Sequence, residues 1–383
     1  MLAPVRTAAR PAHRWLHARL TTPSSRLTLA RASLPNVPAL RRTLATLPGT
    51  TIPKTQRAAI VPGPGAALRI VADHPVPQPA DLRPGECLVK LECTGVCHTD
   101  LHAAKGDWPV PAKTPLIGGH EGVGIIVAIG EHTARSPVKV GDRVGIKWLA
   151  DACGECEFCR KGLEQVCPHA AFSGFTVDGT FSEYVRSFVR HVTPIPAGLA
   201  SAEAASILCA GLTVYRAIKY SGAKLGDWIV LPGAGGGLGH LAVQYATAAG
   251  LRVLAIDTGD AKKSLCLSLG AERWIDFRES KDIVADIQSI TNGGPHAAVV
   301  TAATSEAYRQ AVDYLRPGGT LMAVGLPARA TLDADIFWTV TKSINILGSY
   351  VGNRQDAYEA LDIAASGKVR CFYDLKPLSA LKE

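Results

Sequence analysis

The chain has 383 residues, too many for one small core, so we expect two domains and an appendage. Its formal charge of +8 raises the question of a nucleic-acid or membrane partner, but residues 1–50 carry all of the excess as eight arginines without Lys, Asp or Glu. Removing these eight from the 41 basic residues leaves 33, equal to the 33 acidic residues, so the remaining chain is neutral and its charge does not indicate nucleic-acid binding.

Residues 1–48 have the composition of a mitochondrial transit peptide: rich in Arg, Ser and Thr, free of acids, with scattered Leu, Val and Trp. The alternative is a disordered basic tail that binds an anionic surface. On the first interpretation, cleavage falls between about Arg42 and Pro48 and the mature protein works in the mitochondrial matrix. No later apolar run is long enough to span a bilayer, so we expect no membrane insertion.

The rest of the chain shows two different patterns of predicted elements. From about residue 51 to 205, short β-type runs such as CLVKLECTGV, GVGIIVAIG and GDRVGIKWL alternate with Gly and Pro, which predicts a mostly β domain. From about residue 226, strands alternate with helical patterns, as in DWIVLPG then HLAVQYATAAG and RVLAID then AKKSLCLSLG. Strands separated by helices of this length predict parallel crossovers and an α/β, doubly wound Rossmann sheet.

A glycine-rich turn, PGAGGGLG at residues 232–239, follows a strand and opens an apolar helix. Such a turn lets the backbone approach a pyrophosphate at the helix N-terminus. Asp257 ends the next strand, where a carboxylate that binds both ribose hydroxyls and repels a 2′-phosphate belongs, so the pattern favours NAD over NADP. The alternative is a structural turn with a surface Asp. The glycines assigned to the cofactor are Gly233, Gly236, Gly237 and Gly239.

Four of the ten cysteines lie within fifteen residues: Cys153, Cys156, Cys159 and Cys167. Thiols in a reducing compartment are poor disulfide candidates, so metal binding or catalysis is expected. This spacing can close a tetrahedral zinc site from one loop, and four thiolates leave no open position, which indicates a structural site. A zinc ribbon for nucleic acid, an iron-sulfur cluster and unmetallated cysteines are the alternatives; the neutral chain and the acids in the loop weaken the ribbon.

A third group of Cys, His and acidic residues spreads over CTGVCHTDLHAAKGDWP at 93–109, GGHEG at 118–122 and SILCAGLTVY at 206–215. Its members are too far apart for spacing alone to indicate a metal site. Taken singly, Cys209 on an apolar stretch is typical of a core thiol, and His120 of a hydrogen-bonded histidine.

These segments, with GIKWL, the four-cysteine loop, ILCAG and SYVGNR, resemble the zinc-containing medium-chain alcohol dehydrogenases, and among them the fungal ethanol-type enzymes, over essentially all of the chain from about residue 51. The resemblance implies that Cys97, His120 and Cys209 hold a catalytic zinc with one position open, a ligand set for which alcohol dehydrogenase is the standard example. It also implies two zinc ions per subunit, NAD, and interconversion of a small primary alcohol and its aldehyde.

Further roles rest on the same resemblance. Thr99, the cofactor ribose and His102 would relay the alcohol proton to solvent. Asp100 and Glu121 would orient the metal ligands, with an ordinary loop carboxylate as the alternative for Glu121. Trp108 and Trp148 would narrow the substrate pocket, or else be core aromatics. The residues matched to cofactor contacts besides the glycines and Asp257 are His98 at the phosphates, Lys262 at the ribose, and Thr213 and Val324 at the nicotinamide.

The expected organisation is a leader at 1–48, a β-rich, chaperonin-10-like (GroES-like) catalytic domain at 49–210, a Rossmann NAD-binding domain at 211–347, and at 348–383 the start of a return to the catalytic domain. The active site would lie in the cleft between the domains. The resemblance further implies a homotetramer and a family C-terminus that continues beyond Glu383. A zinc-free quinone reductase and a non-catalytic protein that binds zinc and NAD are the competing functions.

Overall fold

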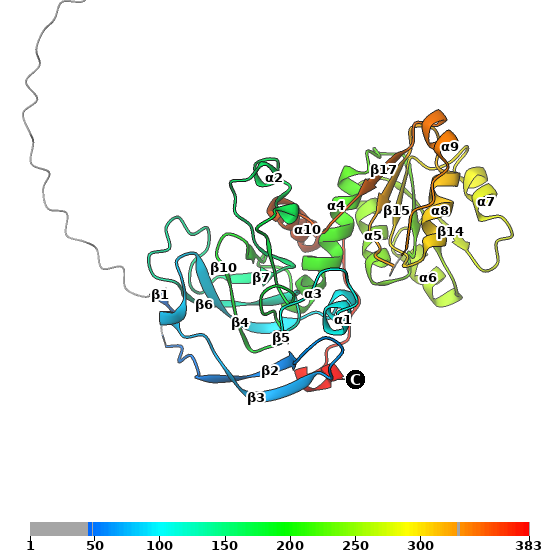
Figure 1. Cartoon of the computed structure of the whole chain (residues 1–383). Coiled ribbons are helices and arrows are strands. Elements are labelled where there is room, and N and C mark those ends of the chain that lie inside the picture. The colour runs from blue at the N-terminus through cyan, green and yellow to red at the C-terminus, as the bar shows by residue number, and fades with distance from the viewer. Residues whose placement is uncertain (1–44, 48, 328–329, 383) are drawn as a thin grey trace, which may run out of the picture. The chain divides into compact units, whose positions relative to one another are not determined.

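The computed structural model describes residues 45–47, 49–327 and 330–382, so most of the expected leader lies outside the described residues. Ala45–Thr46 form a short strand, β1, which pairs with β6 (Gly122–Ile129). The strand falls inside the range expected for the leader. The described structure therefore includes residues that precede the expected boundary at residue 49 (Figure 1).

The first half of the chain is mostly β. Its largest sheet is antiparallel, in the order β10-β4-β6-β7-β11 with β1 on β6. Apolar side chains alternate along its strands and meet in a core that includes Val89, Ile126 and Val144. Besides β1 and β6, its strands are β4 (Glu86–Thr94), β7 (Arg143–Ile146), β10 (Tyr184–Phe188) and β11 (Thr193–Pro194).

Two smaller sheets and short helices complete this half. One sheet has the order β3-β2-β5 and the other pairs β8 with β9. The elements are β2 (Thr55–Val61), β3 (Arg69–Pro75), η1 (Pro79–Asp81), α1 (His98–Lys105), β5 (Leu116–Ile117), β8 (Leu149–Asp151), α2 (Glu157–Arg160), η2 (Glu164–Val166) and β9 (Ala171–Phe172).

A run of consecutive helices connects the two halves: α3 (Ser201–Ser206), η3 (Ile207–Gly211) and α4 (Leu212–Tyr220). The middle segment, η3, is a π-helical turn with four of its five residues buried. Single π-turns inside α-helices occur frequently at functional sites.

The second half contains a six-stranded parallel sheet in the order β14-β13-β12-β15-β16-β17. This is the doubly wound Rossmann order, so the predicted fold class is confirmed. Its strands are β12 (Trp228–Pro232), β13 (Arg252–Asp257), β14 (Arg273–Asp276), β15 (Ala297–Val300), β16 (Thr320–Ala323) and β17 (Asn345–Gly348), and its helices are α5 (Gly237–Ala248), α6 (Asp260–Ser268), α7 (Ile283–Ile290), α8 (Ser305–Tyr314) and α9 (Ile336–Thr341).

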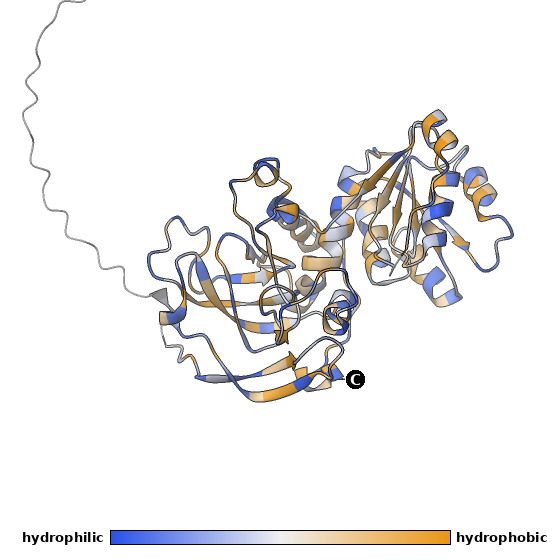
Figure 2. Cartoon of the chain, viewed as in Figure 1, coloured by the Kyte–Doolittle hydropathy of each residue, from blue (hydrophilic) through white to orange (hydrophobic). Residues whose placement is uncertain are grey.

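The central strands of this sheet are apolar along their length (Figure 2), because helices cover both faces of a parallel sheet. After β17, α10 (Arg354–Ala365) packs on α4 and η3, and η4 (Leu378–Lys382) places Leu378 and Leu381 against the β2-β5 core. Among the described helices, none combines the length and apolar character needed to cross a membrane.

Candidate metal and cofactor sites

Three side chains that are far apart in the sequence meet at one point. Cys97 precedes α1, His120 lies between β5 and β6, and Cys209 is the central residue of the π-turn η3. The sulfurs of Cys97 and Cys209 are 4.0 Å apart, and Nε2 of His120 lies 3.2 Å from the Cys209 sulfur. A tetrahedral zinc with bonds of about 2.0–2.3 Å separates its ligand atoms by roughly 3.4–3.8 Å, so this group fits zinc.

The two sulfurs of this group differ in their affinity for a proton. Donation from the Cys209 thiol lowers the pKa of Cys97, and the same hydrogen bond raises the pKa of Cys209. At least one thiolate is therefore favoured before any metal binds, and thiolates are the form of cysteine that ligates metals.

Asp100 orients two of the three ligands from the first turn of α1. Its Oδ2 accepts from the backbone N–H of Cys97 at 2.9 Å, while its Oδ1 lies 2.9 Å from Nδ1 of His120 and accepts from Gly119 N at 3.1 Å. A carboxylate at Nδ1 holds the proton there and leaves Nε2 as the free ligand atom. Asp100 therefore lies behind the ligand atoms of Cys97 and His120.

The carboxylate of Glu121 lies close to the ligand atoms themselves, whereas a residue that only orients the ligands would lie behind them. One of its carboxylate oxygens lies within 4.8 Å of the ligand atoms of Cys97, His120 and Cys209. The residue is 3% exposed, and burial raises its pKa to about 8. Gly95 makes room for it, because a Cβ there would lie 1.9 Å from Oε2 of Glu121. A carboxylate oxygen therefore lies among the ligand atoms of this group.

Aromatic rings enclose the group on one side. Trp148 contacts His120 edge to face, with ring centroids 5.1 Å apart, and Trp108 contacts Trp148 in the same manner at 6.1 Å. Phe175 packs on both indoles. Tyr350, which follows β17 in the second half of the chain, accepts a 2.5 Å hydrogen bond from Nε1 of Trp148. Sequence reasoning did not assign Tyr350, although it lies within the quoted SYVGNR segment.

The two residues expected to relay a proton lie on α1. Thr99 and His102 are one helical turn apart, and the side chain of His102 is 21% exposed, with Nδ1 2.8 Å from Oδ1 of Asp107. The imidazole stacks on Trp108 with centroids 5.3 Å apart. His102 therefore connects the aromatic wall to the surface. His98, at the start of the same helix, is exposed, with its ring 6.3 Å from that of His102.

The four cysteines of the loop at residues 153–167 also come together. Sulfur–sulfur distances of 3.9 Å for Cys153–Cys159, 3.8 Å for Cys156–Cys167 and 3.6 Å for Cys153–Cys167 match the edge of roughly 3.8 Å for a tetrahedral ZnS₄ site. The backbone N–H groups of Glu155 and Cys156 donate to Cys153 and lower its pKa to about 6. The donor set thus fits a zinc ion with four thiolate ligands.

The glycine-rich turn lies between β12 and α5. Gly233 has φ of +83°, which favours glycine, and a Cβ on Gly239 would lie 2.0 Å from the Gly233 carbonyl oxygen, so the strand and helix touch here. Asp257 accepts from Gly235 N at 2.9 Å and from Lys262 Nζ at 2.7 Å. The structure therefore brings Asp257 and Lys262 together, and adds Gly235, which sequence reasoning left out.

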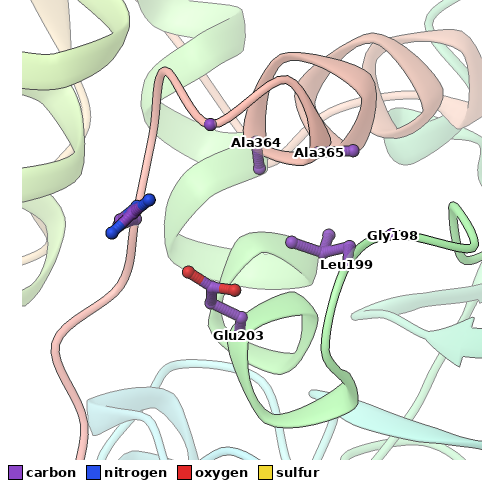
Figure 3. Close-up of a pocket in the computed structure, with 7 residues that line it drawn as sticks. Gly198, Leu199, Glu203, Ala364 and Ala365 are labelled. Atoms are coloured by element: carbon purple, nitrogen blue, oxygen red, sulfur yellow. The ribbon is translucent and has the colours of Figure 1, made fainter.

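Two further residues expected to contact the cofactor are buried. Thr213 lies on α4, four residues after Cys209, and Val324 follows β16. Among the described residues, no hydrogen bond joins either side chain to the group of Cys97, His120 and Cys209 or to Asp257. A cavity of about 370 Å³ lies elsewhere, with the Glu203 carboxylate pointing into it (Figure 3), and none of the expected site residues lines it.

Two family descriptions match the chain: "Alcohol dehydrogenase GroES-like domain" at residues 83–197 and "Zinc-binding dehydrogenase" at residues 237–366. An alcohol dehydrogenase of Schizosaccharomyces pombe is 48% identical over 334 residues, 87% of this chain and 94% of that protein. Alcohol dehydrogenase 1 of Emericella nidulans is 47% identical over 86% of this chain and 93% of its own length.

Solved structures show the same architecture. The alcohol dehydrogenase of the archaeon Aeropyrum pernix matches with a TM-score of 0.75 and 30% identity, over 84% of this chain and 93% of its own. The acetophenone reductase of Geotrichum candidum in complex with NAD matches with a TM-score of 0.74 and 26% identity, over 87% of this chain and 93% of its own.

Proposed function

Because the chain belongs to the zinc-binding medium-chain alcohol dehydrogenases, we propose that it transfers a hydride between a small primary alcohol such as ethanol and NAD, reversibly giving the aldehyde and NADH. Zinc and NAD are its cofactors. One observation carries the proposal: Cys97, His120 and Cys209 converge beneath a wall of aromatic rings. Initial rates of NADH formation across primary alcohols from ethanol to n-hexanol test it, and we expect kcat/KM to fall as the alcohol lengthens.

Each residue of the group has a distinct task in this reaction. Cys97, His120 and Cys209 would hold a zinc ion, which when bound supplies a Lewis acid that favours the alkoxide of the alcohol or polarises the aldehyde carbonyl. Asp100 fixes the orientation of His120 and the backbone of Cys97. Trp108, Trp148 and Phe175 exclude water and limit the width of the alcohol.

The alcohol proton has to leave an apolar pocket. We propose that the hydroxyl of Thr99 and the imidazole of His102, which faces Asp107 and solvent, would carry this proton outward, and that a bound cofactor would supply a ribose hydroxyl between them. The two nitrogens of an imidazole can accept and donate a proton, so His102 can pass this proton on to solvent.

Asp257 should determine the choice between NAD and NADP. Its carboxylate is held by Gly235 N and Lys262, and hydrogen bonds to a charged group contribute about 1.5–3 kcal/mol. We expect Asp257→Asn to raise KM for NAD by roughly 10- to 100-fold and to narrow the preference for NAD over NADP. Steady-state kinetics with each cofactor measures both effects. Asp260→Asn, at an exposed carboxylate on α6, is the control, and an unchanged NAD to NADP ratio in Asp257→Asn would refute the assignment.

We also propose that the protein is a homo-oligomer. The edge strand β17 is exposed, and beside it lies an apolar face on α9, where Ile336, Phe337 and Val340 are 65–80% exposed. A second copy of the chain would cover this face and pair with the free strand edge. Leu347→Lys on β17 should lower the mass in analytical ultracentrifugation, whereas Leu225→Lys, at an exposed leucine elsewhere, should not. A monomeric wild-type protein would contradict the proposal.

For residues 1–48 we propose import into the mitochondrial matrix, with cleavage before Ala45 so that β1 remains in the mature chain. The basic, acid-free composition supports this proposal. A fluorescent reporter fused to residues 1–48 should enter mitochondria, and a reporter that stays in the cytosol would refute it.

A further inference from the structure

A short segment at residues 350–354, which follows β17 and ends on the first residue of α10, is held at both ends by the first half of the chain. At one end, the Tyr350 hydroxyl accepts from Nε1 of Trp148. At the other, Arg354 donates to the Glu164 carboxylate from its backbone N–H at 2.7 Å and from Nε at 2.8 and 3.1 Å. Nδ2 of Asn353 donates to the Gly162 carbonyl oxygen at 2.8 Å.

The backbone between these anchors is strained. Val351 has φ of +40°, in the left-handed region that a β-branched residue rarely adopts. At Gly352, a Cβ would lie 2.3 Å from Cδ1 of Leu212, so a side chain there would have to displace Leu212. A dihedral of this kind persists only where the surrounding contacts impose it. The contacts of Tyr350, Asn353 and Arg354 with the first half of the chain therefore help to hold the turn in this shape.

One anchor belongs to the four-cysteine loop. Glu164 lies between Cys159 and Cys167 and is 5% exposed, and Gly162, which accepts from Asn353, is part of the same loop. A buried carboxylate that loses its cationic partner is strongly disfavoured, so the loop and Arg354 constrain each other. The contacts thus connect the loop to Arg354, Arg354 through the strained turn to Tyr350, and Tyr350 to Trp148 in the aromatic wall.

We propose that Glu164 and Arg354 are positioning residues for the substrate pocket: through them the four-cysteine loop fixes the strained turn that holds Tyr350 against Trp148. The loop then sets the width of the pocket as well as stabilising the fold. The selectivity part of this inference rests on the proposed oxidation of small alcohols. The alternative explanation is that the contacts between the loop and α10 only stabilise the fold and leave the substrate pocket unaffected.

Fluorine NMR on the full chain labelled with fluorotryptophan tests the coupling without any turnover. The Trp148 resonance is identified by its loss in Trp148→Phe. We expect it to shift in Tyr350→Phe and to shift in the same direction in Arg354→Lys and Glu164→Gln. Lys161→Ala removes an exposed ion pair of the same loop and should leave it unchanged. Arg354→Lys keeps the charge and the backbone N–H, so it serves as the test if Glu164→Gln does not fold.

Selectivity gives a second readout that loss of stability would not move. The ratio of kcat/KM for ethanol to that for n-butanol, which is two methylenes longer, should fall about 10-fold in Tyr350→Phe, Arg354→Lys and Glu164→Gln, with KM for NAD unchanged. Even one methylene contributes about 10-fold or more in a fitted pocket. The double variant Tyr350→Phe with Arg354→Lys should match Tyr350→Phe alone, because Arg354 acts through Tyr350.

The outcomes separate the two claims. If Arg354→Lys and Glu164→Gln lower Tm yet leave both the Trp148 resonance and the selectivity ratio unchanged, the positioning role is overturned. A wild-type protein that oxidises no alcohol, but whose Trp148 resonance responds to Arg354→Lys, would refute the proposed function and leave the coupling supported.

Discussion

Replacing Cys97 by serine should reduce kcat/KM for ethanol oxidation roughly a thousandfold or more, because a Lewis acid supplies several kcal/mol of transition-state stabilisation and each 1.36 kcal/mol is a factor of ten. Cys97 is one of only three Cys or His ligands in its group, and a hydroxyl binds zinc less well than a thiolate. Bound zinc should fall from about two ions per chain to about one.

The matched control for this variant is Cys371→Ser, at a half-buried thiol outside both metal groups. It should retain wild-type kinetics and both zinc ions. Near-wild-type turnover in Cys97→Ser with one zinc missing would show that this group is not the reactive centre. Normal zinc content with no turnover would point instead to a role of Cys97 beyond ligation.

Replacing Cys153 by serine should mainly reduce stability. The loop at residues 153–167 has little apolar core, since Phe158 and Val166 are 39% and 45% exposed, so a bound metal would supply most of its folding free energy. We expect the free energy of unfolding to fall by about 4 kcal/mol, as loss of a metal site can cause. Calorimetry should record a Tm lower by roughly 8 °C or more.

Glu157→Gln serves as the control for the loop, because it removes only an exposed ion pair with Lys161 and should change stability by less than about 1 kcal/mol. A chelator that removes zinc from the wild type should lower Tm as Cys153→Ser does. If Cys153→Ser keeps both its zinc and its Tm, the loop is not a structural zinc site.

The features that could be predicted from the sequence are those formed by residues close together in the chain. The four cysteines come from one loop, so their spacing alone predicts a closed site. The glycine-rich turn lies between a strand and a helix that both have clear periodicity, and the parallel order of the sheet follows from the alternating elements. For these features, the local sequence pattern is sufficient to predict the three-dimensional arrangement.

The remaining features depend on contacts between distant segments. Tyr350 reaches Trp148 across 202 positions, and no local pattern indicates that pairing. Glu121 was expected only to orient ligands, but the close approach allowed by Gly95 brings its carboxylate among the ligand atoms. The clustering of Cys97, His120 and Cys209 was expected from family resemblance alone, because the π-turn that directs Cys209 inward has no signature in an apolar helix sequence.

Isotope transfer tests the central claim, that this chain moves a hydride from an alcohol to NAD, most directly. The zinc-loaded full chain would be incubated with NAD and ethanol deuterated at its carbinol carbon, and the NADH analysed by mass spectrometry. We predict deuterium in the NADH, in amounts that fall when zinc is removed and recover when it is restored. A folded protein that holds two zinc ions and binds NAD, yet yields no deuterated NADH, would contradict the account and favour a non-catalytic protein.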